Sequence, residues 1–373
     1  MPGVSPFEWI IQEGFSQKLF PGCAASVILR GEVARRVCVG KLGYDEHGGP
    51  WGEVTPETVY DLASLTKPLA GAVLSGIFLE QKKLALDEPV KRKLPELEGS
   101  AQGEVTLRQL LSHSAGYPAW RPVYEKRFDG CHYLPRGVLL SLAIAEPLEA
   151  RPGEKACYSD LGYMLLTALL ERVGSTRMDA AFTLRVASAL SLKRTFFIPL
   201  PRDDQALPVP LKEIAPTSIC PWRGRLLHGE VEDDNAWALS GVAAQAGLFS
   251  SLSDLENLFL HLRRIYRGEP GLLRPETLAL LWKKEDVPQG TTWALGWDTP
   301  NPVGSHTPSS AGERFSRRAV GALGFTGTSL WYDLDRDLAV LCLSNRVHPC
   351  RETADLKRFR PALHDVAVEE FGR

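Results

Sequence analysis

The sequence predicts an α/β fold of the α+β kind, in which one antiparallel sheet is flanked by helices and carries an inserted, mostly helical region. Three observations lead to this prediction. Alternating apolar segments occur near the start of the chain, similar segments occur near its end, and the stretch between them has mainly helical spacing. We expect one structural unit over residues 1–373, with a sheet region at 1–63 and 290–373 and a mostly helical region at 64–289.

The predicted strands are short segments of alternating apolar residues. Cys23–Leu29 and Val33–Val39 form one hairpin, and Ser329–Leu334 and Leu338–Leu343 form another. Thr58–Asp61 is a further short strand. Both ends of the chain therefore contribute strands to the predicted sheet.

The predicted helices lie mainly between these strands. Leu65–Gln81 is apolar nearly all round, which predicts a buried helix. Thr106-x-x-Gln109 and Ser253-x-x-Glu256 have the pattern of capping boxes. Asp160–Val173 has helical spacing, and Gly174 follows it as a predicted left-handed cap.

Two more segments complete the prediction. Proline is dense between Pro199 and Pro221, which predicts a long irregular connection. Glu352–Phe371 has helical spacing and is the last predicted helix.

Composition and charge narrow the class of protein. The chain is 44% hydrophobic and 24% charged, with a formal net charge of -2, and its basic residues are scattered, so no nucleic-acid partner is expected. No apolar stretch is long enough to span a bilayer, and the first residues lack the pattern of a secretory signal. We therefore expect a cytoplasmic protein. The seven cysteines have no metal-binding spacing, and neither a metal nor another cofactor is expected.

The first candidate for chemistry is the Ser-x-x-Lys pattern of Ser64 and Lys67. It follows the predicted strand Thr58–Asp61 and opens the predicted buried helix. Residues three apart lie on one face of a helix, so Lys67 can lie beside Ser64. The free N–H groups at a helix N-terminus can also stabilise an oxyanion. Taken alone, the pattern also fits a polar helix start without a function.

Two later segments carry further candidates. Tyr158 lies on a loop before the predicted helix, where Ser159 or Asp160 can be the N-cap, although a lone tyrosine also fits core packing. The glycines of Gly321–Gly327 precede a strand and allow a substrate or another backbone to approach closely, as a bulged strand also does. Their spacing does not match the dinucleotide-binding fingerprint.

Together these segments resemble the serine β-lactamase and penicillin-binding protein superfamily, and most closely its class C β-lactamase-like (family VIII-type) esterases and peptidases. Ser64-x-x-Lys67 matches the nucleophile motif. Tyr158-Ser159-Asp160 matches Tyr-x-Asn, with aspartate in place of asparagine. The stretches 105–116, 228–237 and 247–249 are similar to the same family. The resemblance implies a single catalytic unit with the β-lactamase/transpeptidase-like fold.

The resemblance also implies roles for individual residues. Ser64 is the nucleophile of an acyl-enzyme, and Tyr158, as a tyrosinate paired with Lys67, is its base. We expect the charge of Lys67 to lower the pKa of Tyr158 and desolvation to lower the pKa of Lys67, so the two groups titrate as a coupled pair. The backbone amides of Ser64 and Phe325 form the oxyanion hole, and Asp160 lines the substrate site.

The third motif departs from the family. Where the family has Lys-Thr-Gly or His-Thr-Gly, this sequence has Ala322-Leu323-Gly324, which is also expected to contact substrate. Alanine and leucine side chains cannot donate a hydrogen bond to a carboxylate. We therefore predict an esterase for small neutral esters. Arg317 or Arg318 is a possible source of a replacement cation.

Two other functions stay open. The same residues suit a class C-like β-lactamase or a D-amino-acid peptidase, which act on lactams or amides. The altered third motif also fits a catalytically inactive binding protein. His113 and His228 are expected to be structural, and the acidic residues 230–234 to form a turn that, by resemblance, lines the rim of the site. The sequence does not set the oligomeric state.

Overall fold

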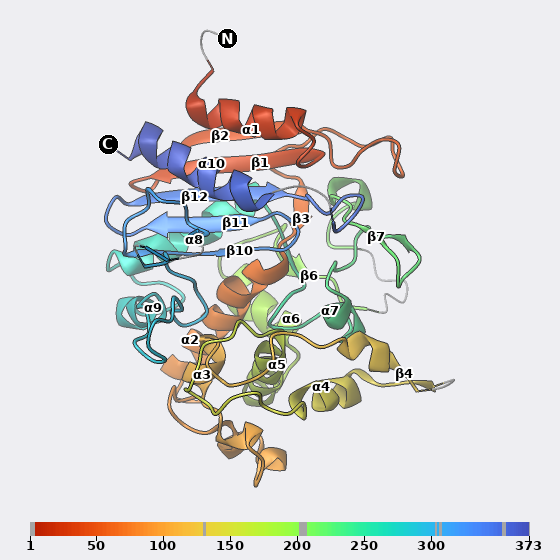
Figure 1. The fold of residues 1–373 in the computed structure, drawn as a ribbon, viewed down its shortest axis with the longest axis vertical. Helices are drawn as coiled ribbons and strands as arrows, with labels where there is room; N and C mark the ends of the chain where they lie inside the picture. Colours follow the sequence, from red (N-terminus) through yellow and green to blue (C-terminus); the bar gives the residue numbers. More distant parts are fainter. Residues whose placement is uncertain are drawn as a thin grey trace.

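The computed structural model describes residues 4–129, 132–200, 207–302, 304–305, 308–352 and 356–372. Its main sheet is antiparallel and has five strands in the order β10-β11-β12-β1-β2 (Figure 1). The predicted α+β fold, with a sheet built from both parts of the chain, is confirmed. The strands are β1 (Gly22–Leu29), β2 (Glu32–Gly40), β10 (Ala319–Leu323), β11 (Ser329–Asp333) and β12 (Leu338–Ser344).

The sheet closes where β1 pairs with β12, from Cys23 opposite Ser344 to Leu29 opposite Leu338. Side chains alternate between the two faces of a strand. Cys23 therefore belongs to the apolar cluster on one face, whereas Ala24 belongs to the cluster on the other face. Both faces of the sheet are thus covered by apolar core.

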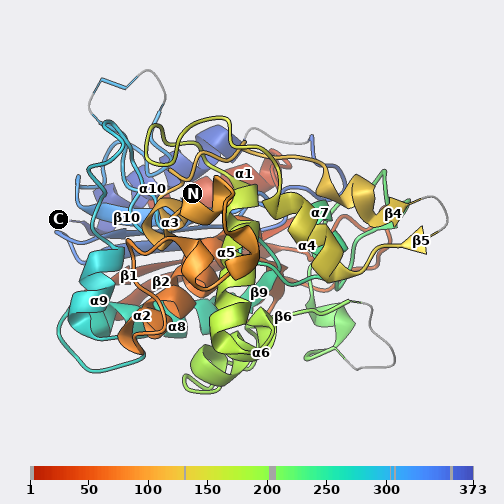
Figure 2. The same cartoon turned by 90° about the horizontal axis from the view of Figure 1, so that it is seen from below.

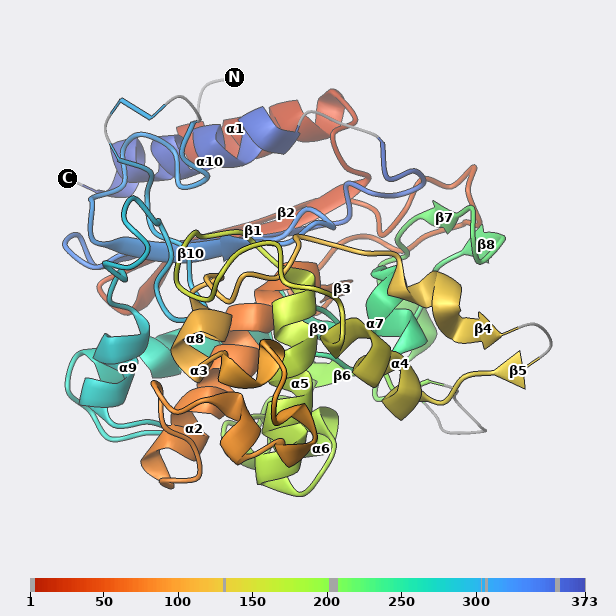
Figure 3. The ribbon, with the colours of Figure 1, turned by 60° about the horizontal axis from the view of Figure 1, so that its bottom comes forward.

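Two helices cover one face of the sheet. α1 (Pro6–Ser16) and α10 (Leu356–Phe371) lie side by side above the strands (Figure 3). α8 (Leu252–Tyr266) packs against β1 and β12 from the opposite side. The sheet is the middle layer between these helices.

The rest of the molecule lies below the sheet in Figure 1, is mostly helical, and lies in front of the sheet in the view from below (Figure 2). A second sheet of three strands joins β3 (Val59–Asp61) to β9 (Leu248–Ser251) and β9 to β6 (Phe196–Phe197). Strand β3 therefore crosses the division that we predict at residue 63. The remaining α-helices of the described chain are α2 (Val73–Glu80), α3 (Leu107–Leu111), α4 (Arg136–Ile144), α5 (Asp160–Gly174), α6 (Met178–Phe182), α7 (Asp234–Ala238) and α9 (Pro275–Leu281). Two further strand pairs join β4 (Phe128–Asp129) to β5 (His132–Tyr133) and β7 (Ile219–Cys220) to β8 (Arg225–Leu226).

The predicted buried helix is helical but not uniform. A 3-10 turn at Ala63–Leu65 and a π-helical turn at Lys67–Ala72 precede α2. π-helical turns occur often at functional sites. This irregular start places Ser64 and Lys67 at the boundary between the two regions.

Two predicted caps are wrong. The N-cap of α8 is Ser251, whose hydroxyl accepts a hydrogen bond from the Asp254 N–H at 3.2 Å, so Ser253 lies inside the helix. The left-handed residue after α5 is Ser175, with φ of 52°, and Gly174 is still helical. The capping box of Thr106 and Gln109 is confirmed.

The proline-rich connection is described only in part, because residues 201–206 lie outside the described residues. The described remainder contains a 3-10 turn at Leu211–Glu213 and the short strand β7. Within the described parts of the chain, no helix combines the length and apolar character needed to cross a membrane. No group of three or more described His, Cys, Asp or Glu side chains is arranged to hold a metal ion.

Candidate active site

The segment before Ser64 has a constrained backbone. Ala63 has φ of 47°, a left-handed conformation that is uncommon for a residue with a Cβ atom and costs about 1–3 kcal/mol. The Asp61 carboxylate accepts the Ala63 N–H at 2.8 Å and the Glu232 N–H at 2.7 Å. Asp61 therefore fixes the turn that presents Ser64.

Two of the predicted residues, Tyr158 and Lys67, contact Ser64. Its Oγ accepts a hydrogen bond from the Tyr158 hydroxyl at 2.8 Å and one from Lys67 Nζ at 3.2 Å. Lys67 also donates to Asp160 Oδ1 at 2.7 Å and to the Gln245 carbonyl at 3.1 Å, and only 2% of its surface is exposed. A serine hydroxyl is thus within reach of two groups that can accept or supply a proton.

The pKa values of Lys67 and Tyr158 are both raised, whereas we expected both to be lowered. Burial alone would lower the pKa of Lys67, but Asp160 and the Tyr158 oxygen raise it above its ordinary value. Burial raises the pKa of Tyr158, against the lowering effect of Lys67. At rest, Lys67 is therefore a cation and Tyr158 a phenol.

Asp160, which stands where the family has asparagine, accounts for part of this difference. It is the first residue of α5, and Ser159 is the N-cap that accepts the Gly162 N–H at 3.1 Å. One Asp160 oxygen is committed to Lys67. Asp160 also lines the main cavity beside Ser64, so contact with a substrate stays a prediction.

His113 lies against this group and not inside a helix. It follows α3 with φ of 56°, and its Nδ1 accepts the Ser159 N–H at 3.1 Å, so a proton on this ring belongs on Nε2. Burial and the charge of Lys67 hold its pKa well below the ordinary value. Its ring packs 4.5 Å from Tyr158 and 4.5 Å from Trp293. No described histidine is hydrogen-bonded to Ser64.

The turn after β10 approaches Ser64 closely. Thr326 and Thr328 donate to the carbonyls of Asp61 and Leu62, at 2.7 and 3.0 Å, and thereby attach this turn to the strand before Ser64. A Cβ atom on Gly324 would lie 1.9 Å from Thr328 Oγ1, so only glycine fits. No described residue accepts a hydrogen bond from the Phe325 N–H.

Two cavities of unequal size meet at Ser64. We call them the large compartment, of about 860 Å³, and the small compartment, of about 260 Å³. Ser64, Tyr158 and Leu323 line both. Among other residues, Trp120, Asp160, Asp233, Gly324, Phe325 and Arg346 line the large compartment, whereas Lys67, His113, Trp293, Asp298 and Ala322 line the small one.

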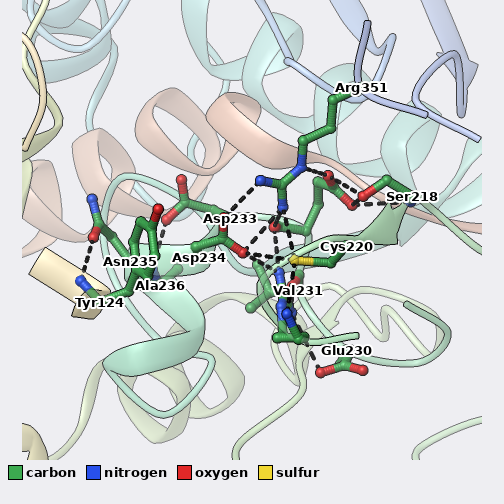
Figure 4. Close-up of polar contacts among 12 residues, drawn as sticks. Tyr124, Ser218, Cys220, Glu230, Val231, Asp233, Asp234, Asn235, Ala236 and Arg351 are labelled. Carbon is green, nitrogen blue, oxygen red and sulfur yellow. Dashed lines mark hydrogen bonds and ion pairs between the residues drawn. The ribbon is translucent and has the colours of Figure 1, made fainter. Parts of the chain in front are cut away.

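Of the acidic loop at residues 230–234, Glu232, Asp233 and Asp234 line the large compartment. Arg351 pairs with Glu232 at 2.5 Å and with Asp234 at 2.6 Å, and Arg223 pairs with Asp234 at 2.7 Å. Figure 4 shows Arg351 reaching from the segment after β12 toward Asp234 at the start of α7. Burial alone would raise the pKa of Asp234, but the two arginines lower it.

The replacement cation expected from Arg317 or Arg318 is absent from both compartments. Arg317 donates to the Asn301 carbonyl, and Arg318 pairs with Asp335 at 3.0 Å. The cations of the large compartment come instead from the segment after β12 and from α10. Sequence reasoning missed them because they follow the third motif by more than 20 residues and share no motif with it; they are Arg346, Arg351, Lys357 and Arg360.

Comparison with known proteins agrees with this geometry. The family profile described as Beta-lactamase matches residues 7–363. The chain belongs to the beta-lactamase family. Among relatives in this family, a putative D-alanyl-D-alanine carboxypeptidase from Escherichia coli (strain K12) is 31% identical over 317 residues, which cover 79% of this chain and 71% of that protein.

Solved structures share the fold. The octameric penicillin-binding protein homologue from Pyrococcus abyssi has a TM-score of 0.68 and 23% identity, over 91% of this chain and 72% of that chain. EstCE1, described as a hydrolase with promiscuous acyltransferase activity, has a TM-score of 0.73 and 21% identity, over 97% of each chain. The predicted β-lactamase/transpeptidase-like fold is confirmed. As a member of the beta-lactamase family, the chain is an enzyme of this serine-hydrolase superfamily.

Proposed function

We propose that this beta-lactamase family member is an esterase that cleaves small neutral esters through an acyl-enzyme on Ser64. The observation that carries the proposal is the contact of Ser64 Oγ with both the Tyr158 hydroxyl and Lys67 Nζ. A serine hydroxyl needs a neighbouring base before it can attack a carbonyl. These two groups are the neighbours that can supply one.

The base in this proposal is the Tyr158 phenolate. Asp160 keeps Lys67 cationic, so Lys67 does not accept the proton itself but stabilises the phenolate electrostatically. Ser64 Oγ attacks the ester carbon as its proton moves to Tyr158, and Tyr158 then gives that proton to the leaving alcohol. A water molecule then attacks the acyl-enzyme as its proton moves to Tyr158. Tyr158 returns that proton to Ser64 Oγ, and the carboxylic acid is released.

The backbone amides of Ser64 and Phe325 form the proposed oxyanion hole. The Ser64 N–H belongs to the first turn of a helix, and the Phe325 N–H has no partner among the described residues. Donors of this kind contribute about 3 kcal/mol each to transition-state stabilisation in other hydrolases. Because they belong to the backbone, the altered third motif leaves them in place.

The small compartment supports the preference for a neutral group. Ala322 and Leu323 offer it no side-chain donor, and it contains the Asp298 carboxyl, whose pKa burial raises to about 6. At neutral pH Asp298 is therefore mostly anionic and repels a carboxylate. A neutral alcohol or acyl group fits this compartment better than a free carboxylate does.

One observation favours a second function. The relative from Escherichia coli carries the name putative D-alanyl-D-alanine carboxypeptidase, and such an activity requires a substrate with a terminal carboxylate. A D-amino-acid peptidase or β-lactamase with Ser64, Lys67 and Tyr158 is therefore the alternative. The carboxylate would have to avoid the small compartment.

A substrate panel tests these proposals. Wild type and Ser64→Ala would be assayed on p-nitrophenyl butyrate, nitrocefin and D-alanyl-D-alanine peptides. We expect ester turnover that is fastest in wild type and lost in Ser64→Ala. Faster turnover of nitrocefin or of the peptide would favour the alternative. A fluorophosphonate probe that fails to label Ser64 would support the inactive binding protein instead.

A further inference from the structure

We infer that the small compartment is an ammonium-binding subsite, in which Asp298 selects substrates that carry a primary amine on the group that occupies it. The inference rests on the proposed function and narrows its substrate class. Of two esters that differ only in a positive charge on this group, the charged one becomes the better substrate. A role is thereby assigned to a carboxyl group that takes no part in the proposed proton transfers.

Asp298 lies beside the altered third motif. Its N–H donates to the Gly321 carbonyl at 2.8 Å, and its carbonyl accepts the Gly321 N–H at 3.0 Å, so its backbone pairs with the edge strand β10. Ala322 follows Gly321 in the chain, and both Ala322 and Asp298 line the small compartment together with Ser64. A group held by Asp298 is therefore inside the cavity that reaches the nucleophile.

The Asp298 carboxylate has no cationic partner. Its hydrogen bonds come from neutral donors, which are Thr292, the Ser310 hydroxyl at 3.1 Å and the Thr299 N–H at 2.9 Å. A carboxylate offers about four acceptor positions, so these donors do not exhaust it. No Lys, Arg or His of the described chain pairs with Asp298. A largely buried charge without a counter-charge is costly, and an ammonium group that binds there removes part of this cost.

Lys67 shares the small compartment but does not neutralise Asp298. Its Nζ donates to Asp160 at 2.7 Å and to the Gln245 carbonyl at 3.1 Å, and both of these residues line the large compartment. The charges of Lys67 and Asp160 therefore compensate each other. Ala322, next to Gly321, provides no cation either, so the positive charge beside Asp298 has to come from a ligand.

The walls of the small compartment also suit a cation. The rings of Trp293 and Tyr158 line it, with centroids 5.5 Å apart, and the faces of aromatic rings attract ammonium groups. Pro68, Ala322 and Leu323 supply apolar surface for a short carbon chain. The volume of about 260 Å³ favours a short aminoalkyl or an aminomethylphenyl group.

The test compares esters in which an ammonium group replaces a methyl group of similar size. For the acyl side, p-nitrophenyl β-alaninate is compared with p-nitrophenyl butyrate. For the alcohol side, 4-(aminomethyl)phenyl butyrate is compared with 4-ethylphenyl butyrate. The kcat/KM ratio of each pair in wild type is divided by the same ratio in Asp298→Asn, which cancels the intrinsic reactivity of the esters.

We expect this quotient to be about ten for the pair whose charged group enters the small compartment, because the variant loses a charge-assisted hydrogen bond to the substrate. Quotients near one for both pairs would overturn the inference. In that case, any loss of activity in Asp298→Asn would mean that Asp298 only positions the segment beside β10.

Matched variants separate the charge of Asp298 from its packing. Asp286→Asn removes a negative charge at an exposed position outside the compartment and should leave both ratios unchanged. Ala322→Lys keeps Asp298 and supplies a competing cation, so it should abolish the preference for the ammonium group. Ala322→Met should retain more of this preference, and an equal preference in the two variants would contradict the inference. Thermal unfolding would show that each variant is folded.

A binding measurement does not depend on catalysis. Benzylammonium chloride, and benzyl alcohol as its neutral counterpart, would be titrated calorimetrically into wild type and Asp298→Asn. Binding of benzylammonium that is lost in Asp298→Asn, in a protein that hydrolyses none of these esters, would support the subsite and contradict the proposed esterase. Ester hydrolysis with quotients near one, together with no benzylammonium binding, would overturn the subsite and leave the esterase intact.

Discussion

The two compartments beside Ser64 differ in size and in the way their charges are held. The large compartment combines the exposed aromatic side chains of Trp120 and Phe325 with the ion pairs of Arg351. The small compartment contains Asp298 and Lys67 beside aromatic and apolar neighbours, and Lys67 is paired with Asp160. Ser64 lines both compartments, so in the proposed function the reaction and the choice of substrate depend on different parts of this site.

This difference follows from chain connectivity. The small compartment is enclosed by β10 and the segment at residues 293–298, which the third motif adjoins. The large compartment is lined by residues 232–234 of the acidic loop and by the chain after β12. Substitutions can therefore change one side without the other, and the following predictions use that property.

The largest effect is expected where both compartments meet, at Tyr158. Tyr158→Phe removes the proposed base and should reduce kcat/KM on p-nitrophenyl butyrate by about 10²–10⁴-fold, since general-base catalysis contributes that much. Tyr163→Phe is the matched control, because its buried hydroxyl contacts the Leu111 carbonyl and not Ser64. Near-wild-type turnover in Tyr158→Phe would contradict the proposed base.

The next effect concerns the ion pairs of the large compartment. Arg351→Met leaves Glu232 and Asp234 without this partner and should lower the free energy of unfolding by about 3–5 kcal/mol, measured by chemical denaturation. Arg225→Met is the control, because the Arg225 side chain is 55% exposed and buried Glu230 keeps Arg223 as a partner at 3.4 Å, so a loss of less than about 1 kcal/mol is expected.

The loss of stability in Arg351→Met should also depend on pH. The pKa of Asp234 is lowered in the folded state, so its contribution to stability is present above its ordinary pKa of 3.8 and is lost as the pH falls through the folded value. The difference between wild type and Arg351→Met should therefore be large near pH 7 and shrink below about pH 4. A difference that is constant over this range would argue against an electrostatic cause.

A smaller effect is expected from restoring the family residue at position 160. Asp160 raises the pKa values of both Lys67 and Tyr158, so activity in wild type should increase as the pH rises above neutral and the base loses its proton. Asp160→Asn removes this negative charge and should move the rising limb of the kcat/KM profile to lower pH by about one unit. An unchanged profile would show that Asp160 does not tune the base.

The smallest effect is expected in the small compartment. Ala322→Lys places a cation near Asp298 and should increase turnover of nitrocefin relative to p-nitrophenyl butyrate by about tenfold, because the lactam carries a carboxylate. Ala322→Met provides a side chain of similar length without the charge. If both variants change the ratio equally, then size and not charge controls entry to this compartment.

The sequence was sufficient for features that depend on local patterns. Alternation predicted the strands, and the spacing of Ser64 and Lys67 together with the family resemblance of Tyr158 predicted the residues that meet at the site. The caps of α5 and α8 were mispredicted because serine is acceptable at neighbouring positions and only backbone geometry decides between them. Arg360 was missed because its place behind Gly324 depends on how α10 packs across the sheet.

The pairing of β1 with β12 has a consequence for how the enzyme is made. Cys23 and Ser344 lie opposite each other in the sheet but are separated by most of the chain, so this contact is among the last that synthesis allows. The turn that carries Phe325 lies between strands of that sheet. A nascent chain can therefore assemble the helices around Ser64 well before it has the proposed oxyanion hole, and we expect hydrolytic activity to appear first when the sheet closes.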